Sequence, residues 1–388
     1  IDIEKDFKFN ISKPLNNLSW NDIYYSNTNN FENFRFNKFY KENFKSKKLS
    51  RNENNKFPLF NNDYFIFSDN KGNIVFFSIK EKNKVKKLNF YKKNYKRNIE
   101  KKLNLFIENN ILFVSDNLGY LYSYDMGSNK MLWAIDHKIP FRSNLKIKNE
   151  VIYTSNQNND FLVFNKKNGK IIKKIPTEEN KIQNSFINNV AEDNLNNFFF
   201  LNSYGSLYSI DFNSLQLKWF TNLSSSFDYN PLNIFSSNII VYQNKKIIVS
   251  TDSHTYVINS SDGSLISKLN FSSVVRPIIN NNYLFIINKN NFLIAYDLID
   301  KRILYSYNID SQIADKLKIK KQKVSLKDFM LVNSEFLILL NNSYILNIDI
   351  KGKLKGIREL NSRVSSKPIF IDSTLLYLDK KNRLRILN

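Results

Sequence analysis

The side chains with the clearest potential for chemistry are three aspartates, Asp69, Asp116 and Asp252, which stand at comparable positions just before a polar turn. Carboxylates gathered at one rim of a fold would offer the oxygen ligands that a divalent cation such as Ca²⁺ requires. The same positions suit an ordinary tight turn, in which an Asp side chain accepts hydrogen bonds from the backbone amides that follow. We favour the turn role, and we predict no catalytic residue, no metal site and no bound cofactor.

Other kinds of reactive side chain are scarce. The chain contains no cysteine, which excludes disulfides, thiolate metal ligands and a cysteine nucleophile. Its only histidines are His137 and His254, so acid–base catalysis by histidine has few candidates. No uninterrupted apolar run of about 18 residues is present, so we expect no membrane-spanning helix.

The net charge of +23 over 388 residues is typical of proteins that bind nucleic acid or anionic lipid. Lysine far outnumbers arginine, however, and Asn, Ile, Phe and Tyr are also abundant. AT-rich codons encode all of these residues, so a genomic base bias accounts for the excess. The basic residues are spread along the chain, and we expect the densest cluster, 92–102, to be a solvated loop. We therefore predict no nucleic-acid partner.

Two stretches share one spacing of Gly, Asp and Trp: DNLGYLYSYDMGSNKMLWAI (116–135) and NSYGSLYSIDFNSLQLKWFT (202–221). In each stretch the Asp follows the Gly by six positions, and the Trp follows the Asp by eight. The six residues are Gly119, Asp125, Trp133, Gly205, Asp211 and Trp219. A motif that recurs along a chain is first a packing device. We therefore expect each Trp to pack between adjacent repeats and each Asp to accept hydrogen bonds from the turn that follows it.

Weaker copies of the same segment occur along the whole chain, and each ends at an Asp, Asn or Ser that we call the anchor. The eight anchors are Ser78, Asp125, Asn165, Asp211, Asn259, Asp297, Asp349 and Asn388. Their successive spacings are 47, 40, 46, 48, 38, 52 and 39 residues, which is the period of a four-stranded propeller blade. The richness in β-branched and aromatic residues also favours strands.

The end of the chain indicates how the propeller closes. An apolar run precedes each anchor segment, and polar turns separate the runs, as in consecutive hairpins. Because the chain stops at the eighth anchor, the last blade has three strands of its own and an open edge. A strand near residues 36–46 is predicted to complete it. The expected fold is all-β, an eight-bladed β-propeller over 34–388 that follows an N-terminal tether and lead-in segment over 1–33.

GYLYSYDMGSNKMLW and GSLYSIDFNSLQLKW resemble the PQQ-type propeller repeat, whose consensus runs G-x-L-Y-A-L-D-x-x-T-G-x-x-x-W. Such repeats occur in quinoprotein dehydrogenases, which bind pyrroloquinoline quinone, and in the BamB family of outer-membrane assembly lipoproteins, which lack that cofactor. The vicinal cysteine pair of many quinoproteins has no counterpart here, and neither their calcium site nor their Trp floor can be located. Segments 13–30 and 44–77 resemble the N-terminal region of alphaproteobacterial BamB-like proteins.

The resemblance to the BamB family implies a scaffold without enzymatic activity at the periplasmic face of the outer membrane. Such a propeller binds the POTRA domains of the central barrel insertase and assists unfolded outer-membrane protein clients. Attachment through an N-terminal lipid is expected if a Cys that precedes Ile1 has been removed. Two alternatives stay open, namely a quinoprotein-like enzyme that depends on pyrroloquinoline quinone, and a basic propeller that binds anionic lipid or nucleic acid.

In the family the insertase contact lies on loops near blades three to five, which correspond here to 177–197 and 224–230. The first of these loops is locally acidic on a basic protein, and this contrast is an independent sign of a partner surface. Only the region is carried over, because the family's contact residues do not align one by one. The predicted partner-binding residues are Glu178, Glu179, Asn189, Glu192, Asp193, Ser225, Phe227 and Asp228. The alternative is that these loops are ordinary polar connections.

Overall fold

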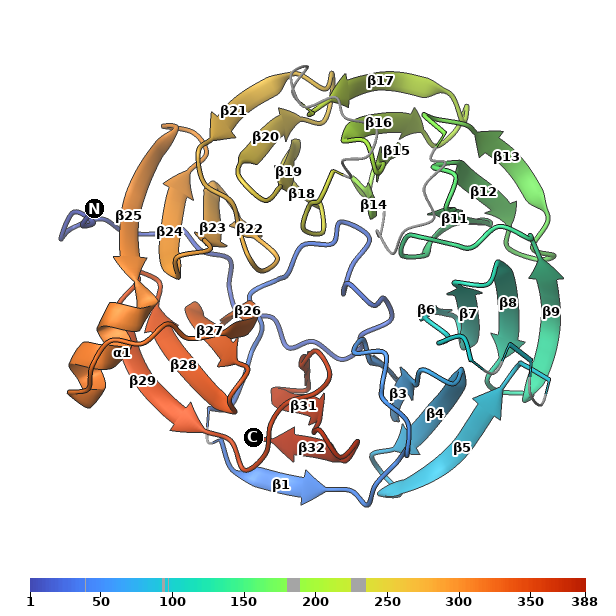
Figure 1. Cartoon of the computed structure of the whole chain (residues 1–388), viewed down its shortest axis with the longest axis horizontal. Coiled ribbons are helices and arrows are strands. Elements are labelled where there is room, and N and C mark those ends of the chain that lie inside the picture. The colour runs from blue at the N-terminus through green and yellow to red at the C-terminus, as the bar shows by residue number, and fades with distance from the viewer. Residues whose placement is uncertain (39, 93–94, 97, 180–188, 225–234) are drawn as a thin grey trace. The chain divides into compact units, whose positions relative to one another are not determined.

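The computed structural model of the 388-residue chain describes all residues except 39, 93–94, 97, 180–188 and 225–234. The described residues form eight four-stranded antiparallel sheets, which are the blades of a β-propeller (Figure 1). Seven sheets consist of four strands that are consecutive in the chain, and the eighth combines one N-terminal strand with the last three. The predicted fold class, including the way in which the last blade is completed, is confirmed.

The blades fall into two compact units, which are described one at a time. Unit 1 comprises Ile1–Asn17, Thr28–Lys38 and Ser236–Val364, and unit 2 comprises Leu18–Asn27, Phe39–Phe235 and Ser365–Asn388. Unit 2 holds blades one to four and blade eight, and unit 1 holds blades five to seven.

The strands of unit 2 come in hairpin-linked sets of four. Blade one is β2 (Leu59–Asn61), β3 (Tyr64–Ser68), β4 (Asn73–Ser78) and β5 (Asn83–Asn89); blade two is β6 (Leu103–Glu108), β7 (Ile111–Asp116), β8 (Tyr120–Asp125) and β9 (Lys130–Asp136). Blade three is β10 (Lys146–Lys148), β11 (Val151–Ser155), β12 (Phe161–Asn165) and β13 (Ile171–Ile175); blade four is β14 (Asn189–Glu192), β15 (Asn197–Leu201), β16 (Ser206–Asp211) and β17 (Leu217–Asn222). Blade eight is β30 (Ile369–Ile371), β31 (Thr374–Leu378), β32 (Leu384–Leu387) and β1 (Glu42–Lys45).

Unit 1 repeats the same arrangement and adds one helix after blade six. Blade five is β18 (Val241–Gln243), β19 (Lys246–Ser250), β20 (Thr255–Asn259) and β21 (Leu265–Leu269); blade six is β22 (Ile278–Asn280), β23 (Tyr283–Ile287), β24 (Phe292–Asp297) and β25 (Arg302–Asn308). The helix is α1 (Ile309–Leu317), and blade seven is β26 (Leu326–Val332), β27 (Glu335–Leu340), β28 (Tyr344–Asp349) and β29 (Leu354–Glu359). No helix in the described part of the chain is both long and apolar enough to cross a membrane.

The anchors predicted from the sequence mark the ends of the third strands. β4, β8, β12, β16, β20, β24 and β28 end at Ser78, Asp125, Asn165, Asp211, Asn259, Asp297 and Asp349, and β32 ends at Leu387, next to Asn388. In blades one and two the second and third strands are almost wholly buried, whereas the fourth strands consist of exposed and half-buried residues. The third strands therefore carry much of the apolar sequence that made the repeat visible.

Asparagine occupies many of the hairpin-turn positions with positive φ at which glycine is usually found. The chain has only eight glycines, and type I′ turns need a positive φ at both central residues. The pairs Asn109–Asn110, Asn244–Lys245 and Asn333–Ser334 all adopt positive φ between the first and second strands of their blades. Asn tolerates this left-handed region better than most residues because its side chain hydrogen-bonds locally.

The last blade is completed by β1, which pairs with β32 in an antiparallel register that sets Glu42 opposite Leu387 and Phe44 opposite Ile386 (Figure 1). Arg385 of β32 strengthens the junction. Its guanidinium donates to Glu42 Oε2 at 2.5 Å and to Asp379 Oδ2 at 2.9 Å. The open edge inferred from the position of Asn388 is thus closed by backbone pairing and by a nearly buried ionic contact.

The segment before β1 packs along the first strands of the blades. In unit 2, Trp20 exchanges backbone hydrogen bonds with Phe60 of β2, Ile107 of β6 donates to Asn21 O at 2.9 Å, and Glu192 of β14 donates to Asn27 O at 3.0 Å. Trp20 is only 3% exposed. The sequence analysis did not predict this burial, and the division between a lead-in and the propeller at residue 33 stays a prediction.

In unit 1 the N-terminal residues are likewise packed. Asn30 Nδ2 donates to Ile279 O of β22 at 2.8 Å, and Phe34 forms a bridge to Val332 of β26. Nearer the N-terminus, Phe9 packs against Tyr283 of β23 with ring centroids 4.8 Å apart. The first residues of the chain therefore contribute apolar surface to blade six.

His137 makes stability depend on pH in a predictable direction. Its ring packs between Phe141 and Phe164, with centroids 5.9 and 4.7 Å away, and burial lowers the pKa of His137. The unfolded chain then binds more protons near pH 6.5, so we expect the free energy of unfolding to fall as pH drops from about 7 to about 5. Urea titrations at both pH values should show a smaller fall in His137→Phe, with His254→Gln as control. An unchanged fall in His137→Phe would refute this assignment.

Candidate partner-binding surface

Glu178 follows β13 and joins blade three to blade four. Its carboxylate accepts hydrogen bonds from Ser206 Oγ, Tyr208 OH and Asn202 Nδ2, each at 2.6 Å. Burial raises the pKa of Glu178, but these hydrogen bonds outweigh it and leave the pKa below its usual value. Glu178 is therefore a charged link between two blades, and its oxygens are already occupied.

Glu192 and Asp193 are also bonded within the protein. Glu192 ends β14, is 3% exposed, and accepts from Tyr153 OH and from Asn27 Nδ2, both at 2.7 Å. Asp193 opens the turn to β15 and accepts from the backbone amide of Asn197 at 3.0 Å. Glu192 therefore links blade four to blade three and to the N-terminal segment, and Asp193 stabilises the first hairpin turn of blade four.

Of the remaining predicted partner-binding residues, one lies at the surface, one lies in a strand, and three lie outside the described residues. Glu179 is exposed, and its backbone carbonyl accepts a hydrogen bond from Tyr204 OH at 3.3 Å. Asn189 is buried on β14, with 3% of its surface exposed. Ser225, Phe227 and Asp228 lie outside the described residues, as do 180–188 of the acidic loop. Glu179 is thus the one predicted acid whose described side chain faces solvent, and a partner-binding role for these residues stays a prediction.

The structure places Trp133 of the repeated motif against the neighbouring blade. Its Nε1 donates to Lys166 O at 3.1 Å, and a Cβ added at Gly169 would lie 2.6 Å from its ring. Tyr305, at the same position in blade six, meets Gly352 of blade seven at the same 2.6 Å. An aromatic ring on a fourth strand therefore packs on a glycine turn of the next blade.

The other residues of the Gly–Asp–Trp motif make contacts within their own blades. Asp125 accepts hydrogen bonds from Gly127 N at 2.8 Å and from Ser128 Oγ at 2.6 Å. Asp211 accepts from Ser214 N at 2.8 Å in the corresponding turn. Gly119 and Gly205 occupy the preceding turns with φ of 98° and 82°, and Trp219 stacks on Phe199 with centroids 6.1 Å apart. These contacts shape the turns and sheets of the blades.

Two of the three aspartates first considered as ligands are committed to their own turns. Asp69 accepts from the amides of Lys71 and Asn73, and Asp116 accepts from Leu118 N at 2.9 Å and from Tyr91 OH at 2.5 Å. Within the described ranges, no three His, Asp or Glu side chains come together in a way that would hold a metal ion. The arrangement supports the turn role.

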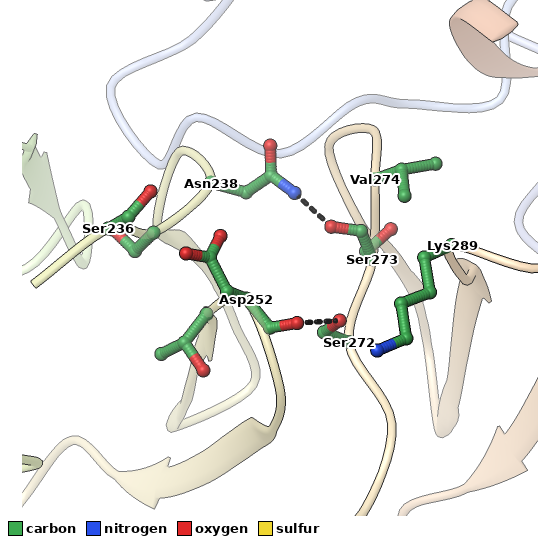
Figure 2. A pocket seen from close by; sticks show the side chains of 9 residues that line it. Ser236, Asn238, Asp252, Ser272, Ser273, Val274 and Lys289 are labelled. Carbon is green, nitrogen blue, oxygen red and sulfur yellow. Dashed lines mark hydrogen bonds between the residues drawn. The ribbon is translucent and has the colours of Figure 1, made fainter. Parts of the chain in front are cut away.

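Asp252 lies in a polar cavity of about 430 Å³ in unit 1, between blades five and six. The residues that line it are Ser236, Ser237, Asn238, Thr251, Asp252, Ser272, Ser273, Val274 and Lys289. Figure 2 shows the Asp252 carboxylate pointing into the space near Ser236 and Asn238. Asn238 Nδ2 donates to Ser273 O, and Ser272 Oγ donates to Asp252 O at 3.0 Å, so both walls are tied together (Figure 2).

Such a cavity, open and rich in hydroxyl and amide groups, suits a polar ligand or an extended backbone. The sequence analysis did not single it out, because its residues come from four separate connections between strands, none of which has a distinctive sequence. The only signal was the density of serine in 236–237 and 272–273.

A larger cavity, of about 810 Å³, lies in unit 2 between blades one and eight. Apolar side chains such as Phe60, Ile371 and Ile386 line it beside several asparagines, and Leu18 at its rim is 66% exposed. The lining of this cavity is therefore a mixture of apolar side chains and polar amides. None of the residues predicted for partner binding from the loops near blades three to five lines this cavity.

The fold is similar to that of several solved β-propellers. The structure resembles BamB from Moraxella catarrhalis with a TM-score of 0.66 at 7% identity, covering 84% of this chain and 94% of that one. It also resembles quinohemoprotein alcohol dehydrogenase from Comamonas testosteroni (TM-score 0.66, 8% identity, 95% and 80% covered) and a europium-containing methanol dehydrogenase (TM-score 0.67, 9% identity, 95% and 89% covered). At these identities the similarity shows the fold alone.

No curated protein matches the sequence. A sequence model of the family described as outer membrane protein assembly factor BamB, in contrast, matches residues 90–307, which is more than half of the chain. The match spans the two best copies of the Gly–Asp–Trp motif. The chain therefore belongs to the BamB family of PQQ-type β-propellers.

Proposed function

We propose that this chain is a non-enzymatic scaffold of the outer-membrane β-barrel assembly machinery, bound at the periplasmic face of the outer membrane. It binds the POTRA domains of the central insertase and assists the insertion of outer-membrane proteins. The observation that carries the proposal is the family match over residues 90–307. The propeller supports it, because loops displayed on a rigid framework commonly carry binding.

The edges of the blades suggest how an unfolded client is held. β9 and β13 are edge strands of their sheets, so one side of each backbone is unpaired. Leu132 on β9 is 50% exposed, and Ile171 and Ile172 on β13 are each 49% exposed. An extended segment can add to such an edge through main-chain hydrogen bonds while apolar side chains provide contact area.

Recovery of the insertase with this chain is the direct test. We expect a tagged copy to retain a POTRA-containing barrel protein from detergent-solubilised envelope. We expect Glu179→Lys to weaken binding to isolated POTRA domains about tenfold, because a reversed charge at an interface repels a complementary partner. Glu81→Lys makes the same charge change at another exposed acid and is the matched control.

Two results would count against the proposal. Failure to recover any POTRA-containing protein would remove its basis, and an equal effect of Glu179→Lys and Glu81→Lys would remove the acidic loop from the interface. The similarity to quinoprotein dehydrogenases raises an enzyme as the second candidate. The described residues fit its calcium ion poorly, because Asp69 and Asp116 are bonded to their own turns. A thermal shift on addition of the quinone and Ca²⁺ would favour the enzyme.

A further inference from the structure

The last turn of α1 and the residues that follow it form an unusual surface segment in unit 1. Residues 315–323, which we call the basic segment, read DKLKIKKQK, and all nine are exposed. Five are lysines and one is Asp315. Between the lysines, Leu317 and Ile319 are 49% and 53% exposed. The segment therefore combines a local positive charge with large apolar side chains that are open to solvent.

The helix α1, whose last three residues begin the basic segment, packs firmly against blade seven. Asn308 caps it by accepting from Ser311 N at 2.8 Å, and Ile309, Ile313 and Ala314 are buried. Gln312 bonds twice to the turn of blade seven, donating to Gly352 O at 2.9 Å and accepting from Leu354 N at 2.7 Å. Since the apolar face of α1 is already used by the protein, Leu317 and Ile319 are not part of the core.

The charge of the basic segment is not neutralised by the described residues around it. None of its lysines, Lys316, Lys318, Lys320, Lys321 and Lys323, forms an ion pair with a described carboxylate. Other exposed lysines, such as Lys138 and Lys355, are paired with nearby aspartates. A solvated lysine-rich face explains the charge but leaves the two exposed apolar residues unexplained.

A small cavity of about 280 Å³ opens at the end of the basic segment. Lys323 and Arg363 contribute two positive charges to its wall, and Ser325, Asn341 and Asn342 contribute polar groups. Asn341 Nδ2 donates to Ser325 Oγ at 2.6 Å, which orients both side chains. No carboxylate lines this cavity, so its chemistry suits a phosphate group.

We propose that the basic segment and this cavity dock on the surface of an anionic phospholipid membrane. The lysines face the headgroups, Leu317 and Ile319 enter the boundary between headgroups and acyl chains, and the Lys323–Arg363 cavity receives one lipid phosphate. Basic residues combined with exposed apolar ones are the composition of interfacial membrane-binding segments. A nucleic acid would account for the lysines and the phosphate, but it offers no acyl layer to Leu317 and Ile319. The inference does not depend on the proposed scaffold role.

Vesicle flotation with the full chain tests the proposal. We expect binding to phosphatidylcholine vesicles that contain phosphatidylglycerol, and none to phosphatidylcholine alone. Lys320→Gln/Lys321→Gln/Lys323→Gln should weaken binding about 100-fold, since each lysine near an anionic surface contributes about a factor of five. The charge-matched control is Lys82→Gln/Lys84→Gln/Lys87→Gln, which removes three exposed lysines from blade one.

The apolar pair is tested in the same assay. Leu317→Ser/Ile319→Ser should weaken vesicle binding about tenfold, because half-exposed side chains have part of their surface left to bury. Ile171→Ser/Ile172→Ser changes two residues of equal exposure on β13 and should leave vesicle binding unchanged. The proposal is overturned if the two triple-lysine variants lose binding equally. It is also overturned if the chain binds a single-stranded RNA oligonucleotide more tightly than vesicles and Leu317→Ser/Ile319→Ser does not weaken vesicle binding.

Discussion

Lys146→Met lowers the free energy of unfolding by about 3–5 kcal/mol, which is the range expected when one partner of a buried ion pair is removed. The Nζ of Lys146 on β10 contacts Asp22 Oδ2, and the two side chains are 0% and 3% exposed. Lys146 also donates to Ser26 O at 2.6 Å, and Asp22 Oδ1 accepts from Tyr24 N at 2.7 Å. Removal of the ammonium leaves the Asp22 carboxylate buried without its counter-charge. Urea unfolding at neutral pH measures the loss.

Two comparisons separate the buried charge from mere loss of packing. Asp22→Leu/Lys146→Met removes both charges and should recover most of the stability, because apolar replacement of a whole buried pair is often neutral. Lys138→Met breaks an ion pair with Asp136 in which Lys138 is 80% exposed, and should change stability by less than about 1 kcal/mol. If the double variant is as unstable as Lys146→Met alone, the ion pair is not the cause.

This ion pair also fixes the position of residues 18–27. Asp22 bridges to Phe106 of β6 as well as to β10, and Asn27 bonds to Glu192 of β14. The segment therefore links the first strands of successive blades in unit 2. Its release in Lys146→Met would expose those strand edges, so the variant that loses stability should also become more sensitive to limited proteolysis near Trp20.

The repeat was predictable because its signals are local. The anchors stand a fixed few residues from apolar strands and polar turns, so the eight third strands and the completion of blade eight by β1 follow from the sequence. The packing of 18–27 was not predictable, because it depends on contacts such as Asp22 with Lys146, 124 positions apart. Such contacts produce no periodic pattern in the sequence. The sequence KIK (146–148), with two lysines, is typical of a strand whose charged side chains face solvent.

The candidate site was only partly predictable for the same reason. Loop 177–197 is acidic in sequence, and this suggested a partner surface. In the structure Glu178 and Glu192 are bonded to residues of other strands, so their charge serves the joint between blades three and four. Composition shows that a loop is acidic, but only the tertiary structure shows which carboxylates are already satisfied. Of the acids in this loop, only Glu179 is exposed to solvent, as expected of a residue that contacts a partner.

Gly169→Ala should lower the free energy of unfolding by about 2–5 kcal/mol. Gly169 has a φ of 68°, and an L-residue in that left-handed region costs about 1–2 kcal/mol. Its new Cβ would lie 2.6 Å from the ring of Trp133, and such overpacking adds about 1–3 kcal/mol. Movement of the ring would also weaken the bond from Trp133 Nε1 to Lys166 O, now 3.1 Å long. Urea unfolding again gives the measurement.

A double-mutant cycle of Trp133 and Gly169 tests whether the Trp133 ring packs on the glycine. If the ring packs on the glycine, Gly169→Ala should cost about 1–3 kcal/mol less in a Trp133→Leu background than in the wild type, as expected for residues in contact. Gly356→Ala is the control, because a Cβ there meets nothing within 4 Å. Additive effects would mean that the two residues are independent. Coupling would show that the Trp of the Gly–Asp–Trp motif joins one blade to the next. If Trp133→Leu also leaves POTRA binding unchanged, the variable loops and the strand edges become the candidates for partner recognition.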